Sequence, residues 1–262
     1  PRCATTADCR ASASQTEAWT LKWNCLNGIA TRFLKNLTED GMPKTALVTG
    51  ANRGIGLELV RALCARGDRV IAACRSESVE LRSLDVEVEE GVDVTSDDSV
   101  AHLVRRLESQ PIDLLINNAG ILSRETLAAM DFDAIRWQFE VNAMGPLRVT
   151  RALLPQMGPG SKVGIVTSRM GSLEDNTSGS RYGYRMSKAA ANMAGVSLAH
   201  DLNDRGVAVA LLHPGYVKTD MTGGNGHIGP AESAQGLLDR MDELNLGNSG
   251  RFWHANGDIL PW

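Results

Sequence analysis

A tyrosine and a lysine stand four residues apart in the stretch from Tyr184 to Lys188. The surrounding sequence favours a helix, and residues at this spacing lie on one helical face. A free phenol titrates near ~10, so at neutral pH it gives up its proton reluctantly unless a nearby cation stabilises the ionised form. Lys188 is placed to supply that charge. The pair therefore predicts acid–base chemistry, although the same spacing also occurs on ordinary solvated helices.

A glycine-rich segment is a second candidate site. Gly50, Gly54 and Gly56 follow the β-rich run 45–49 and precede the helical stretch 57–66, with the spacing Gly-x-x-x-Gly-x-Gly. Glycine permits a tight turn and lets backbone N–H groups approach phosphate oxygens, while a helix N-terminus adds partial positive charge. The segment therefore predicts a pyrophosphate site, with a plain structural turn as the alternative.

The elements that must position these residues alternate along the chain. Expected strands, separated by helix-period stretches, are 45–49, 69–74, 86–92, 112–117, 162–167 and 207–213. Gly67 is expected to end the first helix, and Ser96 and Asp131 to begin two others. Strands separated by helices indicate a parallel sheet covered on both faces. We therefore expect one α/β domain with a Rossmann-type doubly wound sheet, whose ligand crevice lies beyond the carboxyl ends of the strands.

Composition excludes several classes of protein. The 262 residues carry a net charge of -4 with no basic stripe, which argues against a nucleic-acid partner. No run approaches the ~18 apolar residues of a membrane span. The five cysteines contain no Cys-x-x-Cys pair, so we expect neither a metal site nor a disulfide framework and place the chain in a reducing cytoplasm.

Residues 1–41 differ from the rest. They contain three of the five cysteines and two tryptophans and show no sustained period. They also lack the apolar core of a secretory signal. We expect an irregular or partly helical extension outside a catalytic domain that spans residues 42–262.

The order of these motifs resembles the short-chain dehydrogenase/reductase family over about residues 42–262. The resemblance rests on the segment 49–56, Asp93, the Asn-Asn-Ala-Gly turn 117–120, Asn142, Ser168, Tyr184 with Lys188, and the segment 214–219. It implies a Rossmann-type fold, a nicotinamide cofactor, and hydride transfer to or from the carbon of a small-molecule carbonyl or alcohol.

The resemblance assigns roles to the catalytic candidates. Ser168, at the end of a strand, would hold the substrate oxygen, with Thr167 and Ser172 as rivals. Tyr184 would act as general acid or base, and Lys188 would lower the pKa of its phenol and bind the nicotinamide ribose. Tyr182 is a weaker candidate because a methionine, not a lysine, follows it by four residues.

Asn142 matches the family's helix asparagine that supports a water relay to the lysine. Its alternative is a buried asparagine satisfied by backbone groups.

Cofactor choice depends on the end of the second strand. No acid stands there to bind a ribose 2′-hydroxyl, whereas Arg75 follows the strand and Arg53 lies in the glycine segment. Two guanidinium groups could clamp a 2′-phosphate, so NADP(H) is expected over NAD(H). Asp93 is expected at the adenine, or else as a simple helix-capping acid, and Asn117 is expected close to the cofactor. The full cofactor set is Gly50, Asn52, Arg53, Gly54, Ile55, Gly56, Arg75, Asp93, Val94, Asn118, Ala119, Gly120, Tyr184, Lys188, Pro214, Gly215, Val217 and Thr219.

Within the family, the short segment 221–230 and the aromatic ending resemble the sniffer-like carbonyl reductases and the C-factor branch. This implies a small aldehyde or ketone reductase, or alternatively a signalling protein that binds NAD(P) with incidental turnover. The tail 251–262 is expected to cover the last strand. Helices near 131–157 and 181–204 are expected to form a homodimer or homotetramer interface.

Overall fold

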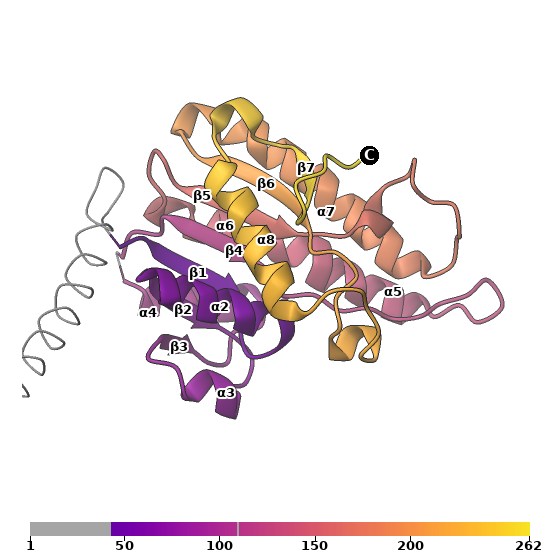
Figure 1. Ribbon diagram of the computed structural model, residues 1–262, viewed down its shortest axis with the longest axis horizontal. Coiled ribbons are helices and arrows are strands. Elements are labelled where there is room, and N and C mark those ends of the chain that lie inside the picture. Colours follow the sequence, from indigo (N-terminus) through magenta and orange to yellow (C-terminus); the bar gives the residue numbers. More distant parts are fainter. Residues whose placement is uncertain (1–42, 109) are drawn as a thin grey trace, which may run out of the picture. The chain divides into compact units, whose positions relative to one another are not determined.

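The computed structural model describes residues 43–108 and 110–262 (Figure 1). The expected extension, residues 1–41, lies outside the described residues. Seven strands form one parallel sheet in the order β3-β2-β1-β4-β5-β6-β7. The strands are β1 (Thr45–Thr49), β2 (Arg69–Ala73), β3 (Glu87–Glu89), β4 (Leu114–Asn117), β5 (Lys162–Val166), β6 (Ala208–His213) and β7 (Phe252–His254). The doubly wound parallel sheet expected from the sequence is confirmed.

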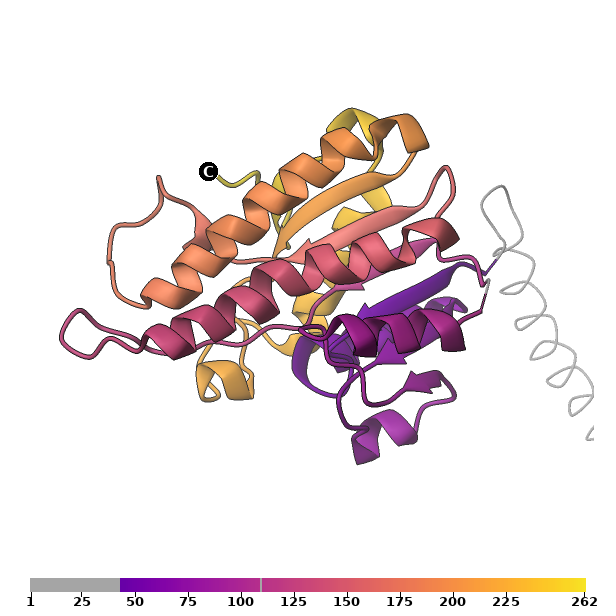
Figure 2. The ribbon, with the colours of Figure 1, turned by 180° about the vertical axis from the view of Figure 1, so that it is seen from behind.

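Helices cover both faces of this sheet, as Figures 1 and 2 show from opposite sides. Each face buries its own apolar cluster, one under α2 and α8 and the other under α4, α6 and α7. The helices are α2 (Gly54–Arg66), α3 (Val79–Arg82), α4 (Asp97–Arg106), α5 (Phe132–Phe139), α6 (Gly145–Leu153), α7 (Tyr182–Asp201) and α8 (Pro230–Glu243). A π-helical turn, η1 (Glu140–Met144), joins α5 to α6, and the 3-10 turns are η2 (Leu154–Gln156), η3 (Arg169–Gly171), η4 (Asn203–Arg205), η5 (Asp220–Thr222) and η6 (Leu246–Asn248).

Helix ends follow the expected capping chemistry. Gly67 adopts φ 86° and donates its N–H to the carbonyls of the last turn of α2. The side chains of Ser96 and Asp131 accept backbone N–H groups in the first turns of α4 and α5. These three predictions are confirmed.

The carboxyl-terminal tail differs from the expectation that residues 251–262 would cover the last strand. Residues 252–254 form β7, a seventh strand that pairs in parallel with β6. The chain then folds back, so that Leu260 donates its N–H to Phe252 O at 2.8 Å and Trp262 stacks on the Phe252 ring at 5.5 Å. A three-residue strand is too short to show a period, which is why the sequence pattern missed it.

β3 is shorter than the expected run 86–92. Gly91, at φ 76°, turns the chain immediately after this edge strand and donates its N–H to Arg75 O at 3.2 Å. A glycine can adopt this conformation without steric cost, so it ends the strand early.

None of the helices in the described residues is long and apolar enough to cross a membrane.

Candidate active site

The glycine segment forms a close turn between β1 and the N-terminus of α2. Gly50 and Gly54 have positive φ values of 65° and 54°. A Cβ on Gly56 would lie 2.2 Å from Gly50 O and 2.6 Å from Asn118 Nδ2. Any side chain at Gly56 would therefore distort the glycine segment and push it away from the turn at residues 117–120.

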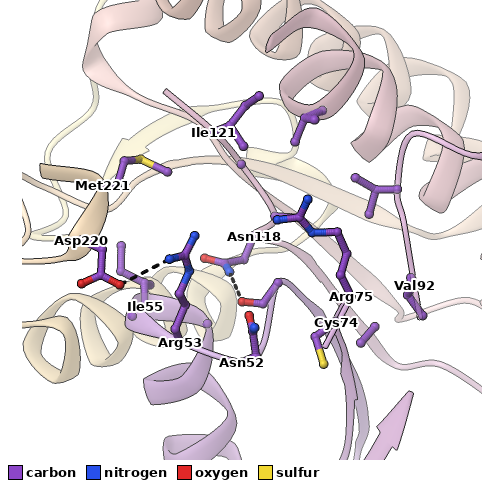
Figure 3. A pocket seen from close by; sticks show the side chains of 18 of the residues that line it. Asn52, Arg53, Ile55, Cys74, Arg75, Val92, Asn118, Ile121, Asp220 and Met221 are labelled. Atoms are coloured by element: carbon purple, nitrogen blue, oxygen red, sulfur yellow. Dashed lines mark hydrogen bonds and ion pairs between the residues drawn. The ribbon is translucent and has the colours of Figure 1, made fainter. Parts of the chain in front are cut away.

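The neighbouring turn at residues 117–120 is bound to the glycine segment. Thr49 Oγ1 accepts the N–H groups of Asn118 and Ala119, each at 3.1 Å. The Asn118 amide donates to Thr49 O at 3.0 Å and Gly50 O at 3.2 Å (Figure 3). Asn117, which we expected close to the cofactor, is buried and donates to Thr150 Oγ1 at 3.1 Å. Asn118, not Asn117, is the asparagine that reaches the cleft.

These turns border a cleft of about 430 Å³ at the carboxyl ends of β1, β2 and β4. Helix α2 begins there without a side-chain cap, and its first residues line the cleft. The expected cofactor residues that line it are Gly50, Asn52, Arg53, Gly54, Ile55, Gly56, Arg75, Asp93, Val94, Asn118, Ala119, Gly120 and Thr219. Lining residues that we did not single out are Ala73, Cys74, Val92, Ile121, Trp137, Val141, Asp220 and Met221.

Two arginines border this cleft. Figure 3 shows the Arg53 and Arg75 guanidinium groups directed to the same side of the glycine segment. Arg53 Nη1 lies 3.4 Å from Asp220 Oδ2, whereas the Arg75 side chain has no hydrogen bond or ion pair within the described residues. An unpaired guanidinium beside an open cleft is suited to bind an anion.

Asp93 faces the same cleft. Burial alone would raise the pKa of its carboxyl, but two hydrogen bonds from Thr95 and the charges of Arg75 and Arg148 hold it below its ordinary value. Asp93 Oδ1 accepts the backbone N–H and the hydroxyl of Thr95 just before Ser96, the N-cap of α4, which matches its alternative as a capping acid, and its adenine contact stays a prediction.

The Ser168 side chain lies beside the Tyr184 phenol, close enough to lower the pKa of that phenol as a hydrogen-bond partner. Ser168 also accepts the N–H of Met170 at 3.1 Å, at the start of η3. Burial raises the pKa of the Tyr184 phenol, while the Ser168 bond and the charge of Arg181 act in the opposite direction. The pKa is therefore raised overall, not lowered as we expected, because desolvation outweighs the neighbouring charge.

Lys188 is buried one helical turn after Tyr184. Its Nζ donates to Val166 O at 2.9 Å and lies 5.7 Å from the centroid of the Tyr184 ring. Burial lowers the pKa of its ammonium to about 8. A Cβ on Gly120 would lie 3.6 Å from Nζ, so the lysine approaches the edge of the cleft beside Gly120.

Asn142 lies in the π-helical turn η1. Its side chain accepts the N–H of Ile121 at 2.8 Å and donates to Ile121 O at 2.9 Å and Ser187 Oγ at 3.0 Å. A Cβ on Gly120 would lie 3.3 Å from Asn142 Oδ1, so the amide is near Lys188. Its contacts match the alternative of an asparagine satisfied by backbone groups, and the water relay stays a prediction.

The segment after β6 reaches the cleft through one of its predicted residues. Thr219 packs against Gly54, where a Cβ would lie 3.5 Å from its methyl group. Pro214, Gly215 and Val217 do not line the cleft. Val217 is buried and bridges to Ile228, so its side chain serves the fold of this segment.

The rivals of Ser168 make structural contacts. Thr167 Oγ1 donates to Lys188 O at 3.3 Å, and Ser172 Oγ donates to Trp262 O at 3.1 Å. Sequence reasoning missed Asp220, Arg181, Glu125 and Gln138. Asp220 could have been found, since it directly follows Thr219, which was a candidate. Glu125 could not, because an isolated glutamate in a loop gives no periodic sequence pattern.

Comparison with known proteins agrees with this geometry. The pattern of the short chain dehydrogenase family matches residues 44–227. The 1-hydroxy-2-glutathionyl-2-methyl-3-butene dehydrogenase of Rhodococcus sp. (strain AD45) is 47% identical over 224 residues, which is 83% of this chain and 99% of that protein. The C-signal of Myxococcus xanthus is 47% identical over 155 residues, covering 58% of this chain and 93% of that protein.

Two solved structures share the fold. The carbonyl reductase Sniffer of D. melanogaster superposes with a TM-score of 0.78 at 28% identity, covering 84% of this chain and all of that one (100%). The NADPH-bound carbonyl reductase from chicken fatty liver gives 0.76 at 29% identity, covering 84% and 99%. With its parallel sheet, its glycine segment and its clustered serine, tyrosine and lysine, the chain belongs to the short-chain dehydrogenase family.

Proposed function

We propose that this protein is an NADP(H)-dependent oxidoreductase that reduces an aldehyde or ketone to an alcohol, or catalyses the reverse reaction. The observation that carries the proposal is the clustering of three side chains: Ser168 lies beside the Tyr184 phenol, and Lys188 Nζ lies 5.7 Å from the centroid of the Tyr184 ring. A protonated phenol and a second hydroxyl that meet at one point can bind a single carbonyl oxygen.

The described residues fit a nicotinamide dinucleotide. The uncapped N-terminus of α2 and the tight glycine segment suit a pyrophosphate. Asp93 keeps one carboxylate oxygen clear of Thr95, on the side of the cleft where the adenine would lie. When bound, the nicotinamide supplies or accepts the hydride.

In the reductive direction, Tyr184 donates its phenolic proton to the carbonyl oxygen. Its raised pKa keeps the proton in place until a negative charge develops on that oxygen. Ser168 donates a hydrogen bond to the same oxygen, and the Lys188 ammonium stabilises the resulting phenolate and binds the ribose hydroxyls. Asn142 supports the water relay that returns a proton toward Lys188.

The preference for NADP(H) rests on Arg53 and Arg75. Both guanidinium groups border the cleft and could bind a 2′-phosphate, and no acid stands at the end of β2, where Cys74 and Arg75 follow the strand. The chicken carbonyl reductase, a structural relative, was crystallised with NADPH bound.

Turnover of a substrate panel with both cofactors tests the proposal. Aldehydes, ketones and quinones should oxidise NADPH faster than NADH, measured by the loss of absorbance of the reduced nicotinamide. In the oxidative direction, with NADP⁺ or NAD⁺ and a gain of absorbance as the signal, the panel should include alcohols with a thioether-linked peptide, because the name of the Rhodococcus relative describes such a compound.

The variant Tyr184→Phe separates the mechanism from binding. We expect kcat to fall by several orders of magnitude, by about 10² to 10⁴ from the lost acid alone, with cofactor affinity nearly unchanged. Tyr182→Phe, which removes a hydroxyl from the first residue of α7, is the matched control and should keep its kcat. A kcat of Tyr184→Phe equal to that of the wild type would contradict the proposed mechanism.

A signalling protein is the second candidate function, because of the identity with the C-signal of M. xanthus. In that case NADPH would bind to the protein in a fluorescence titration, but no compound of the panel would be turned over.

We further propose a cytoplasmic location. We also propose a homodimer or homotetramer, because Trp137, Met186 and Met193 expose apolar surface on α5 and α7; light scattering of the full chain measures that state.

A further inference from the structure

Glu125 is a buried carboxylate in the loop between β4 and α5, with 3% of its surface exposed. Its oxygens accept hydrogen bonds from the Ser123 hydroxyl, from Gln138 Nε2 at 2.8 Å and from the Gly183 N–H at 3.3 Å. No cation is paired with it within the described residues. Because no cation offsets the cost of burying this carboxylate, the loss of any one of these neutral hydrogen-bond donors would destabilise it.

Gln138, on α5, is fully buried and fixes the orientation of this carboxylate. Its Oε1 accepts the N–H of Ser123 at 3.0 Å, so its Nε2 must face Glu125. A Cβ on Gly183 would lie 2.2 Å from that Nε2, which leaves no space for a side chain at Gly183. The loop, α5 and α7 are therefore packed together around one carboxylate.

Helix α7 depends on this contact for its first turn. Its N-cap, Arg181, is held at φ 52° and ψ 48° and makes no side-chain cap. The usual side-chain acceptor for the first N–H groups of a helix is thus absent. Glu125 replaces it from 58 residues away, since its carboxylate accepts from Gly183 and its carbonyl accepts the Arg181 N–H at 2.8 Å.

The capped turn is the turn that carries Tyr184. One helical turn after Gln138, Asn142 donates to Ser187 Oγ, and Ser187 Oγ in turn donates to Tyr184 O at 2.9 Å. Gln138 and Asn142 thus contact α7 on either side of the tyrosine. The loop before α7 is mostly exposed, and it contacts the first turn of α7 through the Arg185 side chain, which donates to Gly179 O, Ser180 O and Ser178 Oγ.

We propose that Glu125, oriented by Gln138, is a positioning residue that caps α7 and holds the Tyr184 phenol against Ser168. This inference rests on the proposed function, in which that phenol is the proton donor. Its effect comes through the geometry of the helix start, not through contact with substrate.

Glu125→Gln tests the inference with little change of shape. It places an amide N–H group opposite the donors of Gln138 or Gly183. We expect kcat to fall by about 10- to 100-fold, as for a small misplacement of a catalytic group, with KM and the NADPH dissociation constant changed much less. The exposed Glu80 gives the matched control, Glu80→Gln, which should behave as wild type.

A swapped pair provides a rescue. In the double variant Glu125→Gln/Gln138→Glu, the new carboxylate at 138 accepts from Ser123 and from the amide at 125, whose carbonyl oxygen accepts from Gly183. The second N–H of the amide at 125 donates to the Ser123 hydroxyl, which changes from donor to acceptor, so these partners are satisfied again and kcat should recover most of the loss. A general loss of packing would not be repaired by this exchange.

The phenol itself gives a readout that does not need turnover. The chain has three tyrosines, so Tyr182→Phe/Tyr216→Phe leaves Tyr184 as the only phenol in an absorbance titration. In that background, Glu125→Gln should lower the pKa of Tyr184 toward its ordinary value, because water reaches a loosened helix start. Ser123→Ala, which removes one donor, should give a smaller shift of the same sign and is informative even if Glu125→Gln does not fold.

The inference is overturned if Glu125→Gln keeps both its kcat and the Tyr184 pKa. It is also overturned if folding and NADPH binding are lost along with kcat while Ser123→Ala leaves the Tyr184 pKa unchanged, since Glu125 would then be purely structural. If the wild type turns over none of the panel, the proposed function fails, and the phenol titration still decides whether Glu125 positions Tyr184.

Discussion

Arg53 Nη1 and Asp220 Oδ2 lie 3.4 Å apart and join the glycine segment to the segment that follows β6 (Figure 3). Both side chains are largely exposed, at 69% and 81%, and such ion pairs contribute only about 0–1 kcal/mol. Arg53 is therefore held at the mouth of the cleft by a contact that costs little to break. Asp220 competes with any phosphate for the same guanidinium.

Asp220→Asn should strengthen NADPH binding. Removing the carboxylate frees Arg53 and takes a negative charge away from the 2′-phosphate, so the NADPH dissociation constant should fall several-fold. NADH lacks that phosphate and should change much less. Fluorescence titration with both cofactors measures the difference, and an equal change for the two would contradict this role of Asp220.

Arg75→Ala should weaken NADPH binding more than NADH binding. Hydrogen bonds to charged groups contribute about 1.5–3 kcal/mol, so we expect a loss of about 10- to 100-fold for NADPH. Arg61→Ala, which removes an arginine paired with Glu58 on α2, is the control. An unchanged ratio of the two affinities would exclude Arg75 from the clamp.

Gly56→Ala should damage both stability and the cofactor site. The added Cβ would lie 2.2 Å from Gly50 O and 2.6 Å from Asn118 Nδ2, so the glycine segment must distort and move away from the 117–120 turn. Overpacking of this kind costs about 1–3 kcal/mol. Gly158→Ala, where a Cβ meets nothing within 4 Å, is the control. Urea unfolding should give a lower free energy of unfolding for Gly56→Ala than for Gly158→Ala, and NADPH titration should give a weaker affinity. Similar free energies and affinities for the two variants would refute the close approach of Gly56 to Gly50 and Asn118.

Lys188→Met should stabilise the cofactor-free protein at pH 7. Burial lowers the folded-state pKa of Lys188 from 10.5 to about 8, so the ammonium opposes folding at every pH below about 8. That cost, at most about 3 kcal/mol before the lost bond to Val166 O is subtracted, is relieved as the pH rises from about 8 to 10.5. Urea unfolding measures the free energy of unfolding of Lys188→Met and of the wild type at pH 7 and pH 10. The difference between the two proteins should be smaller at pH 10, and a difference that does not change with pH would be inconsistent with this pKa.

Much of the fold and part of the site could be predicted from local sequence. The glycine segment and the alternation of strands and helices depend on neighbouring residues, and the doubly wound sheet followed from them. The family resemblance favoured Ser168 over Thr167 and Ser172, and the hydroxyls of these two rivals bond to backbone carbonyls.

The remainder depends on contacts between distant segments. Burial raises the pKa of Tyr184, which no spacing rule reveals. The cap on α7 comes from Glu125 and the partner of Arg53 is Asp220, 167 residues away along the chain. β7 is stabilised by pairing with β6, not by a pattern of its own.

The π-helical turn η1 lets the helical path from α5 to α6 hold one residue more than a regular helix would. The wider turn absorbs that residue, so Gln138 and α6 keep nearly the relative orientation that they would have in a regular helix. Deleting one residue of 140–144 would therefore remove the wide turn and still leave Gln138 facing Glu125. The cap on α7 thus does not depend on the length of the chain at this point.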